Sequence, residues 1–382
     1  MYDPVEAARG LRGRIQEAAS VIEEGRHLPA SLVGEMRAAG LFHMAIPRSL
    51  GGLEADPIAA ARAVEEVAFA DGSAGWCVML AAQSTAFAGL LPEDEARTIF
   101  GNGGIVAGTA RPIGRAIPVR EPSAGYLVSG RWPFASGSSH ATWFLAECIV
   151  YEGDQPRLDE RRNPLTRAVF VPKAGVTIHD TWHTTGLRGT ASNDFSVEDA
   201  FVPEDRGFQT LVAEPVHPWV LYRAPQLIFM NHGSHALGIA RASLEAATGI
   251  VHTKKGWGDQ PLREVLRVQS VIAETTALIE AARHYLYATA DGLWQAVQAG
   301  VEDTRLLRSR MRLAASHAAS SSLQAVDLLH STMGTTAIFT QSPLERQFRD
   351  IHTAAAHVMI GPLTYQAAGR VELGMEPDFP FF

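Results

Sequence analysis

The feature that most constrains the fold of this chain is a change of composition near residue 101 and another near residue 206. Between them, glycine, proline and β-branched residues dominate, and short alternating runs stand between turn signals, as at residues 125–130, 143–146, 167–171 and 194–197. Such runs predict short strands in a compact β domain. On both sides the apolar residues recur at helical spacing. The order therefore predicts helices over residues 1–103, a β domain over 104–210 and helices over 211–382.

Helical periodicity is clearest in two stripes whose residues are four, three and four positions apart. These stripes are Leu11, Ile15, Ala18 and Ile22, and Leu307, Met311, Ala314 and Ala318. We also expect a helix from about Pro57 to Ala70, with Asp71 introducing the next one. Long helices with apolar faces and short connections predict a bundle in the C-terminal region. The predicted fold class is α+β.

Charge and hydropathy exclude several functions. The net charge is −8 and no basic run is present, which argues against a nucleic-acid binder. The longest apolar stretch, residues 74–91, has Gln83, Ser84 and Thr85 in its middle, so we expect a buried helix and no membrane segment. Cys77 and Cys148 lack CxxC spacing and are expected to be buried free thiols. The N-terminus lacks the basic-then-apolar order of a signal peptide, which predicts a cytoplasmic protein.

The common sequence motifs of catalysis are missing. The chain has no Walker loop, no G-x-G-x-x-G between a strand and a helix, no H-E-x-x-H and no G-x-S-x-G. His179, Asp180 and His183 come nearest to a ligand cluster, but no cysteine or further histidine is nearby. We expect a strand edge there and no metal site. What remains is cofactor chemistry without a nucleotide-binding glycine loop.

Two segments of the predicted β domain, residues 130–143 and 182–194, are rich in small hydroxylated residues and aromatics. This mixture suits a flat heterocycle, because aromatics can cover its face while hydroxyls and backbone amides bond its edge. It also suits the tight turns of an ordinary sheet. Residue chemistry alone leaves both interpretations open.

Four motifs, taken in order, resemble those of a known family. They are Gly-Arg-Trp-x-Phe-x-Ser-Gly-x-x-His-Ala-x-Trp (130–143), Gly-Leu-Arg-Gly-Thr-x-Ser (186–192), Phe-Val-Pro (201–203) and Pro-Leu-x-Arg-x-x-Arg-Asp (343–350). Together they resemble the two-component flavin-dependent monooxygenases of the acyl-CoA dehydrogenase-like superfamily, and the resemblance spans nearly the whole chain. It implies an N-terminal helical domain, a central β-barrel-like domain that binds flavin, and a C-terminal four-helix bundle.

The resemblance also implies a reaction and partners. The chain would be the oxygenase component that receives reduced flavin, FADH2 or FMNH2, from a separate NAD(P)H-dependent flavin reductase. Reduced flavin and O2 would form a C4a-(hydro)peroxide that hydroxylates a small aromatic substrate, whether phenolic, indole-type or polycyclic. By the same analogy the protein is expected to assemble as a homotetramer.

The family's flavin contacts can be transferred residue by residue. The resemblance implies that the hydroxyl of Ser136 hydrogen-bonds flavin N5 and that Phe134 covers the isoalloxazine ring. Thr190 and Ser192 fall in the segment that approaches the flavin, with Trp182 beside it. These five residues are the expected cofactor site.

The last motif bears on the chemistry. In many dehydrogenases of this superfamily a catalytic glutamate follows the equivalent of Arg349 and Asp350, whereas this chain has His357 and Val358 there. An acyl-CoA dehydrogenase is therefore disfavoured. His357 matches a histidine near the reacting flavin carbon, and an ordinary pKa of ~6.5 would let it exchange a proton near neutral pH. The alternative is a structural histidine on a bundle helix, which is the expectation for His352.

The substrate pocket is defined less well. Trp76, Gln83, Ser84 and His140 are candidates to line it, although His140 could equally cap a turn. Relatives that grip a phenol often carry a histidine where this chain has Ser84, so a phenolate clamp is disfavoured. An indole or polycyclic ring gains support. An N- or S-oxygenating enzyme of the same fold and a non-catalytic helical binding protein are the remaining alternatives.

Overall fold

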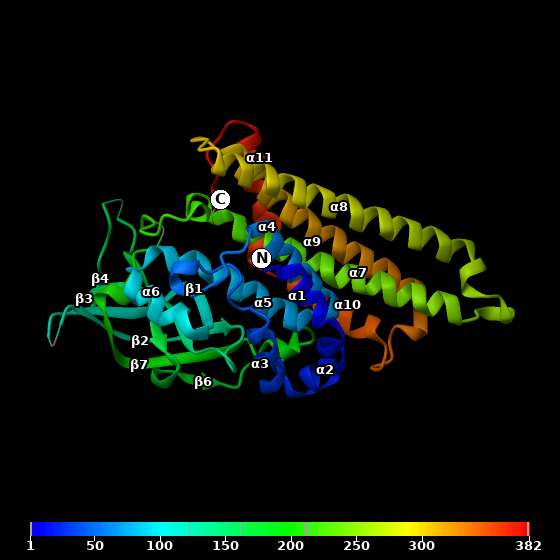
Figure 1. Cartoon of the computed structure of the whole chain (residues 1–382), viewed down its shortest axis with the longest axis horizontal. Helices are drawn as coiled ribbons and strands as arrows, with labels where there is room; N and C mark the ends of the chain where they lie inside the picture. The colour runs from blue at the N-terminus through cyan, green and yellow to red at the C-terminus, as the bar shows by residue number, and fades with distance from the viewer. Residues whose placement is uncertain (1, 122, 161, 211–212, 380–381) are drawn as a thin grey trace.

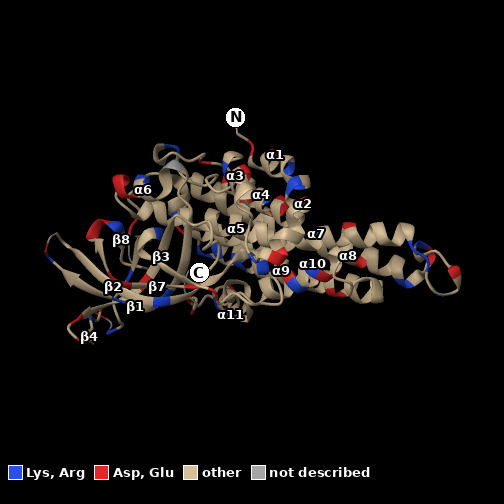
Figure 2. Cartoon of the chain, turned by 90° about the horizontal axis from the view of Figure 1, so that it is seen from below, with Lys and Arg blue, Asp and Glu red and all other residues tan. Residues whose placement is uncertain are grey.

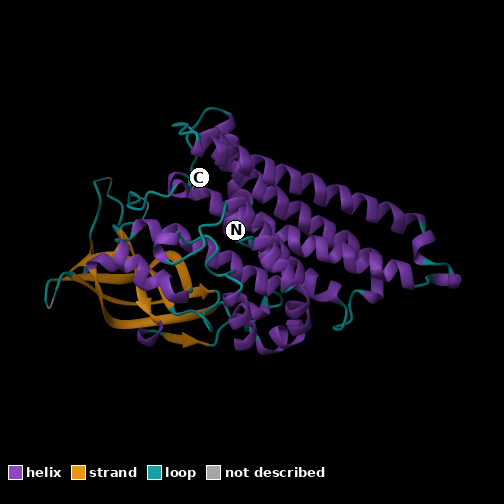
Figure 3. Cartoon of the chain, viewed as in Figure 1, coloured by secondary structure: helices purple, strands orange, loops and turns teal. Residues whose placement is uncertain are grey.

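The computed structural model describes residues 2–121, 123–160, 162–210, 213–379 and 382. In sequence, helices precede and follow the strands. In space, the β-sheet lies at the end of the molecule opposite the far tip of the long helices (Figure 1). The helices and the sheet form separate regions (Figure 3), which confirms the α+β class. The first six helices are α1 (Pro4–Gly10), α2 (Arg12–Gly25), α3 (Ala30–Ala38), α4 (Pro57–Ala70), α5 (Gly72–Ser84) and α6 (Glu93–Phe100).

The two central helices of this region, α4 and α5, each begin at an aspartate. Asp56 and Asp71 both accept hydrogen bonds from backbone N–H groups of the first turn, at 2.9 Å. Helix α5 ends at Ser84, and the predicted helix over 74–91 is wrong in its second half, which is the short 3-10 helix Thr85–Leu90. The hydroxyls of Ser84 and Thr85 bond carbonyls three residues back, at 2.9 and 2.6 Å, and so compete with the α-helical ladder.

The central sheet has eight strands in the order β6-β7-β2-β1-β3-β5-β8, with β4 paired to β3. The pairing of β1 with β3 is parallel and the other pairings are antiparallel. Trp132, Phe144 and Phe195 fill its core, and the rings of Trp132 and Phe195 stack at 5.1 Å. The strands are β1 (Val106–Val119), β2 (Gly125–Ala135), β3 (Trp143–Glu152), β4 (Gln155–Pro156), β5 (Thr166–Pro172), β6 (Thr177–His179), β7 (Asn193–Pro203) and β8 (Gly207–Phe208).

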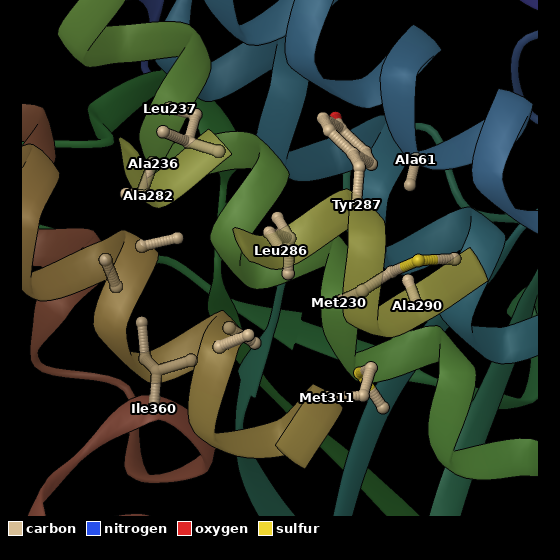
Figure 4. Packing of buried hydrophobic residues seen from close by; sticks show 14 of the residues in the cluster. Ala61, Met230, Ala236, Leu237, Ala282, Leu286, Tyr287, Ala290, Met311 and Ile360 are labelled. Atoms are coloured by element: carbon tan, nitrogen blue, oxygen red, sulfur yellow. The ribbon is translucent and has the colours of Figure 1, made fainter. Parts of the chain in front are cut away.

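The C-terminal helices form the predicted bundle, with α8 and α9 running side by side away from the sheet (Figure 1). Met230, Leu286 and Met311 belong to its buried core, one from each of three long helices (Figure 4). At Gly233 an added Cβ would lie 3.1 Å from the Cα of Ala315, so α7 and α9 approach closely there. The helices are α7 (Met230–Thr253), α8 (Leu266–Gln298), α9 (Arg305–Met333), α10 (Pro343–Ala355) and α11 (Pro362–Glu372).

A buried carboxylate joins the first helical region to the bundle. Glu65 on α4 is 1% exposed and accepts hydrogen bonds from Arg241 at 2.5 Å, Arg283 at 2.8 Å and the hydroxyl of Tyr287 at 2.6 Å. Two guanidinium groups meet its charge and offset the cost of removing it from water. The arrangement fixes α4 against α7 and α8.

The cysteines, the surface charges and the helix lengths bear on the expectations from composition. Cys77 and Cys148 are free and buried, as predicted, and burial raises the pKa of both thiols. Acidic and basic residues are interspersed over the body and the bundle (Figure 2). Among the described residues, no helix has the length and apolar character needed to cross a membrane, and no three His, Cys, Asp or Glu side chains gather as a metal site would require.

Candidate functional site

A line of three hydroxyl groups, here called the hydroxyl row, lies where the end of β2 meets the loop before β7. The Oγ atoms of Ser136 and Ser192 are 2.6 Å apart, and Ser192 Oγ is 2.7 Å from Thr190 Oγ1. At one end Trp76 of α5 donates its Nε1–H to Ser136 at 3.1 Å. At the other end Thr190 donates to the carbonyl of Leu187 at 2.8 Å. Ser136, Thr190 and Ser192, predicted from separate motifs, are thus brought together.

The backbone of the loop over 186–192 is held in an uncommon conformation. Leu187 and Ala191 have φ values of 50° and 45°, in the left-handed region that residues with a Cβ rarely occupy. Contacts from the neighbouring turn hold the loop there. The N–H of Gly137 donates to the carbonyl of Thr190 at 2.7 Å, and Ser138 Oγ donates to that of Ala191 at 2.6 Å. The loop is therefore held by specific hydrogen bonds within the protein.

Helices α5 and α10 hold the same loop from the opposite side. Asp350 Oδ1 accepts from the N–H of Leu187 at 2.6 Å, and Ser73 Oγ accepts from that of Gly189 at 3.1 Å. Gly186 lies so close to α10 that an added Cβ would be 2.1 Å from the backbone oxygen of Arg349. The motif containing Arg349 and Asp350 therefore supports the loop that carries Thr190 and Ser192.

The carboxyl group of Asp350, which holds this loop, has a raised pKa. Asp350 is 2% exposed, and burial together with the nearby carboxyl of Asp71 raises its pKa to about 7. Burial also raises the pKa of Asp71, against the opposing effect of Arg346 at 3.8 Å. Two buried carboxyl groups in one region resist simultaneous ionisation, so a proton is retained there up to neutral pH.

Three imidazoles contact Trp76: those of His232 and His235 on α7, and that of His357, which follows α10. We call these three histidines together with Trp76 the histidine cluster. The ring of His357 stacks on that of His232, with centroids 4.5 Å apart at 28°. Trp76 meets His232, His235 and His357 edge-on at 5.7, 5.2 and 5.6 Å. Thus Trp76 joins the hydroxyl row to His357.

All three imidazoles are neutral at pH 7. Burial lowers the pKa of His357 to about 4, with a further contribution from the charge of Arg312, and burial lowers the pKa of His235 to about 4. The pKa of His232 also falls well below its ordinary value. The expectation of an ordinary pKa for His357 is therefore wrong, because its surroundings exclude water and carry a positive charge. Its Nδ1 accepts from the N–H of Met359 at 3.3 Å, so the ring proton resides on Nε2.

Two aromatic residues lie beside the hydroxyl row. Phe134 is 55% exposed and has a φ of 66°, and its ring meets that of Trp182 at 6.3 Å, nearly perpendicular. Trp182 is fixed by its Nε1–H, which donates to the carbonyl of Leu187 at 2.9 Å. An exposed phenylalanine in strained backbone beside buried hydroxyls suits a flat ring that stacks and bonds along one edge. The residues present therefore fit an isoalloxazine.

The other predicted pocket residues, Gln83, Ser84 and His140, make their contacts outside the histidine cluster. Gln83 donates to the carbonyl of Ile228 at 3.4 Å, and Ser84 bonds within its own helix. His140 packs on Phe42 at 5.6 Å behind the turn that carries Ser136. Burial lowers the pKa of His140 to about 4, and its Nδ1 has no hydrogen-bond partner in the described part of the chain.

Three residues of this region were not singled out from the sequence: His232, His235 and Arg312. A signal for the two histidines did exist, since a spacing of three places both on one face of a helix. His352, expected to be structural, is exposed and bonds Asp327 at 2.9 Å.

Comparison with known proteins places the chain in a family. Residues 6–92 match the family described as "Acyl-CoA dehydrogenase, N-terminal domain", and residues 230–362 match "Acyl-CoA dehydrogenase, C-terminal domain". The chain is 32% identical to the indole-3-acetate monooxygenase of Pseudomonas putida, over 92% of this chain and 89% of that protein. It is 28% identical to the FADH2-dependent resorcinol hydroxylase, oxygenase component, of a Rhizobium species, over 96% and 93%.

A solved structure extends the similarity to three dimensions. The crystal structure of the 3-HSA hydroxylase from a Rhodococcus species superposes with a TM-score of 0.90, covering all of both chains at 25% identity. Because the whole of each chain is matched, the order of helices, sheet and bundle is shared as well as the individual regions. The predicted fold and family are thereby confirmed.

Proposed function

The chain belongs to the flavin-dependent monooxygenases with the acyl-CoA dehydrogenase fold, and from this premise we propose that it is the oxygenase component that hydroxylates an aromatic substrate with reduced flavin and O2. The observation that carries the proposal is the continuous contact from the hydroxyl row through Trp76 to His357. This contact supports the proposal, because one side chain, Trp76, separates hydroxyl groups suited to a flavin edge from a proton-bearing imidazole.

The direction of hydrogen bonding in the row bears on which flavin it suits. The only hydroxyl proton of Thr190 is donated to the carbonyl of Leu187. The hydroxyl of Ser192 must therefore donate to Thr190, and that of Ser136 must donate to Ser192. Ser136 also accepts from Trp76, which leaves it one unshared electron pair. That pair suits the N5–H of a reduced flavin, whereas the bare N5 of an oxidised flavin offers no proton.

When bound, reduced flavin supplies the electrons that activate O2, and the protein supplies position, dryness and protons. Ser136 would hold the flavin edge, with Thr190 and Ser192 fixing its hydroxyl. Phe134 and Trp182 would cover the ring. His357, neutral and protonated on Nε2, would donate a hydrogen bond to an oxygen at the reacting centre. Trp76 and the imidazoles of the histidine cluster would exclude water.

The carboxyl group that the last motif supplies is engaged inside the protein, which argues against dehydrogenation of an acyl thioester. Asp350 is the carboxyl that the last motif brings closest, and its Oδ1 is already bonded to the N–H of Leu187 inside the protein. The name of the Rhizobium relative identifies it as the oxygenase component of a larger system, and a separate NAD(P)H-dependent flavin reductase is accordingly proposed as partner. Homotetrameric assembly and the domain boundaries at residues 103 and 210 stay predictions.

The proposal can be tested with photoreduced FAD or FMN. The protein, reduced flavin and air-saturated buffer are mixed with a panel of indoles, phenols and fused aromatics, and both hydroxylated product and hydrogen peroxide are measured. We expect product from at least one aromatic compound. Failure across the panel together with reduction of bound flavin by an acyl-CoA would overturn the proposal.

Variants test the assignment of Ser136. Ser136→Ala should shift the yield from product to hydrogen peroxide, because the flavin edge loses its hydrogen-bond acceptor. Ser243→Ala is the matched control, since Ser243 is also buried and its hydroxyl donates to the carbonyl of Ile239 in its own helix. Equal yields from both variants would remove Ser136 from the site.

A further inference from the structure

Arg312 is a buried cation that has no hydrogen-bond partner among the described residues. It lies on α9, is 1% exposed, and none of its three guanidinium nitrogens has a hydrogen-bond partner among the described residues. Burial lowers its pKa to about 10, so the group is still charged at neutral pH. The buried carboxylate of Glu65, by contrast, is paired with the two arginines Arg241 and Arg283. A buried charge without a counter-charge is strongly destabilising, which favours a ligand that supplies one.

Aromatic rings lie next to the guanidinium of Arg312, and its N–H groups have no acceptor among the described residues. The ring of Phe229 lies 4.3 Å from its central carbon, and the ring of Phe382 lies 5.7 Å away. Aromatic rings attract the face of a guanidinium but satisfy none of its N–H groups. The fork of donors along its edge matches the two oxygens of a carboxylate, which can accept two parallel hydrogen bonds.

Arg312 also lies close to the site described above. Its charge contributes to the lowered pKa of both His232 and His357, and α7 and α9 touch at Gly233 and Ala315. Further buried polar atoms in this part of α7 and α9 lack hydrogen-bond partners among the described residues: both ring nitrogens of His232, Asn231 Oδ1, Ser309 Oγ and Ser316 Oγ. Ser309, Arg312 and Ser316 share one face of α9 by their spacing of three and four.

We propose that Arg312 binds the carboxylate of the aromatic substrate, and that the enzyme acts on aromatic acids in preference to neutral arenes. The inference rests on the proposed function, since it assigns the substrate class of the same site. The ring of the substrate would lie toward His357 and the hydroxyl row, with its acidic side chain extending past the imidazoles to α9. The substrate carboxylate then neutralises a charge that has no hydrogen-bond partner among the described residues.

The test compares acids with their neutral amides. Indole-3-acetate and indole-3-acetamide, and phenylacetate and phenylacetamide, are titrated by calorimetry under anaerobic conditions into the protein with reduced FAD. A hydrogen bond to a charged group contributes roughly 1.5–3 kcal/mol, so we expect each acid that binds to do so about tenfold to a hundredfold more tightly than its amide. Equal affinities for acid and amide would overturn the proposal.

Variants on one helix identify the residue responsible. Arg312→Met should reduce the preference for the acid to within about twofold, and Arg312→Lys should retain part of it. Arg310→Met is the control and should keep the full preference, because Arg310 is exposed and pairs with Glu372. Arg312→Met could instead weaken the binding of reduced flavin while the acid still binds more tightly than the amide. In that case Arg312 binds the flavin, and the proposal is wrong.

Thermal unfolding separates a ligand site from a structural one. Without substrate, Arg312→Met should melt at the same temperature as the wild-type protein or higher, because it removes an unpaired buried charge. A lower melting temperature together with equal binding of acid and amide would assign Arg312 to a protein carboxylate, such as one from a neighbouring subunit. If acids and amides bind equally but hydroxylated product still forms, the substrate inference fails while the proposed function stands.

Discussion

Asp350→Asn gives the sharpest prediction about the support of the hydroxyl row. In the native protein the pKa of Asp350 is about 7, against an ordinary value of 3.8, because the carboxyl is buried near Asp71. The folded state therefore holds the proton at a pH where the unfolded chain has lost it. Stability consequently falls as pH rises from about 4 to about 7. At ~1.4 kcal/mol per pKa unit, the whole loss is about 4 kcal/mol.

The asparagine removes this titration and keeps an oxygen for the N–H of Leu187, which Asp350 now meets at 2.6 Å. The free energy of unfolding of the variant minus that of the wild type should thus rise with pH. Between pH 5 and pH 8 we expect an increase of about 3 kcal/mol in favour of Asp350→Asn. Urea unfolding, followed by tryptophan fluorescence at intervals of one pH unit, measures this difference directly.

A second variant controls for the hydrogen bond. Asp350→Ala also removes the titration, but it leaves the N–H of Leu187 buried without an acceptor, at a cost of about 1–3 kcal/mol. Its stability should lie below that of Asp350→Asn by a similar amount at every pH. A difference between Asp350→Asn and wild type that is flat or falls with pH would refute the argument, because Asp350 would then be ionised and satisfied in the native protein.

Three further predictions concern the loop, the tryptophan and acid stability. Gly186→Ala puts a Cβ 2.1 Å from a backbone oxygen of α10, so reduced-flavin affinity should fall at least tenfold in an anaerobic titration; Gly249→Ala, with nothing within 4 Å, should match wild type. Trp76→Phe deletes the donor to Ser136 and should lower the unfolding free energy by about 1 kcal/mol and increase hydrogen peroxide release; unchanged release would separate Trp76 from the row. His235 has a folded pKa of about 4, below its unfolded value, so stability should fall as pH drops from about 6.5 to about 4, by up to ~3 kcal/mol. His235→Gln should lessen that loss in urea titrations, and an identical loss would contradict the assignment.

The sequence predicted the arrangement of elements well where periodicity is strong. The helix at Pro57–Ala70 has the predicted bounds, and each of the four alternating runs forms part of a strand. The break of α5 at Ser84 was missed, since hydropathy does not register hydroxyls that bond their own backbone. Such local competition depends on side-chain geometry that a pattern of apolar residues does not contain.

The candidate site divides along a similar line. Ser136, Thr190 and Ser192 could be singled out because each belongs to a motif whose residues are contiguous in the chain. The spacing of His232 and His235 was a weak signal that was not used, and Arg312 had none, because its significance comes from the packing of α7 on α9 and from its lack of hydrogen-bond partners among the described residues. The pKa of His357 is likewise a property of tertiary burial and of a charge 45 residues away in sequence. A sequence motif can identify a residue such as His357, but the assembled core decides its protonation.

The central claim is that this chain transfers an oxygen atom from O2 to an aromatic ring with electrons from reduced flavin. Photoreduced FAD, the protein and indole-3-acetate are mixed with 18O2 in unlabelled water, and the product is analysed by mass spectrometry. We predict one 18O atom in each hydroxylated product molecule and no product when the flavin is omitted. Product that takes its oxygen from water, or forms without reduced flavin, would contradict the account.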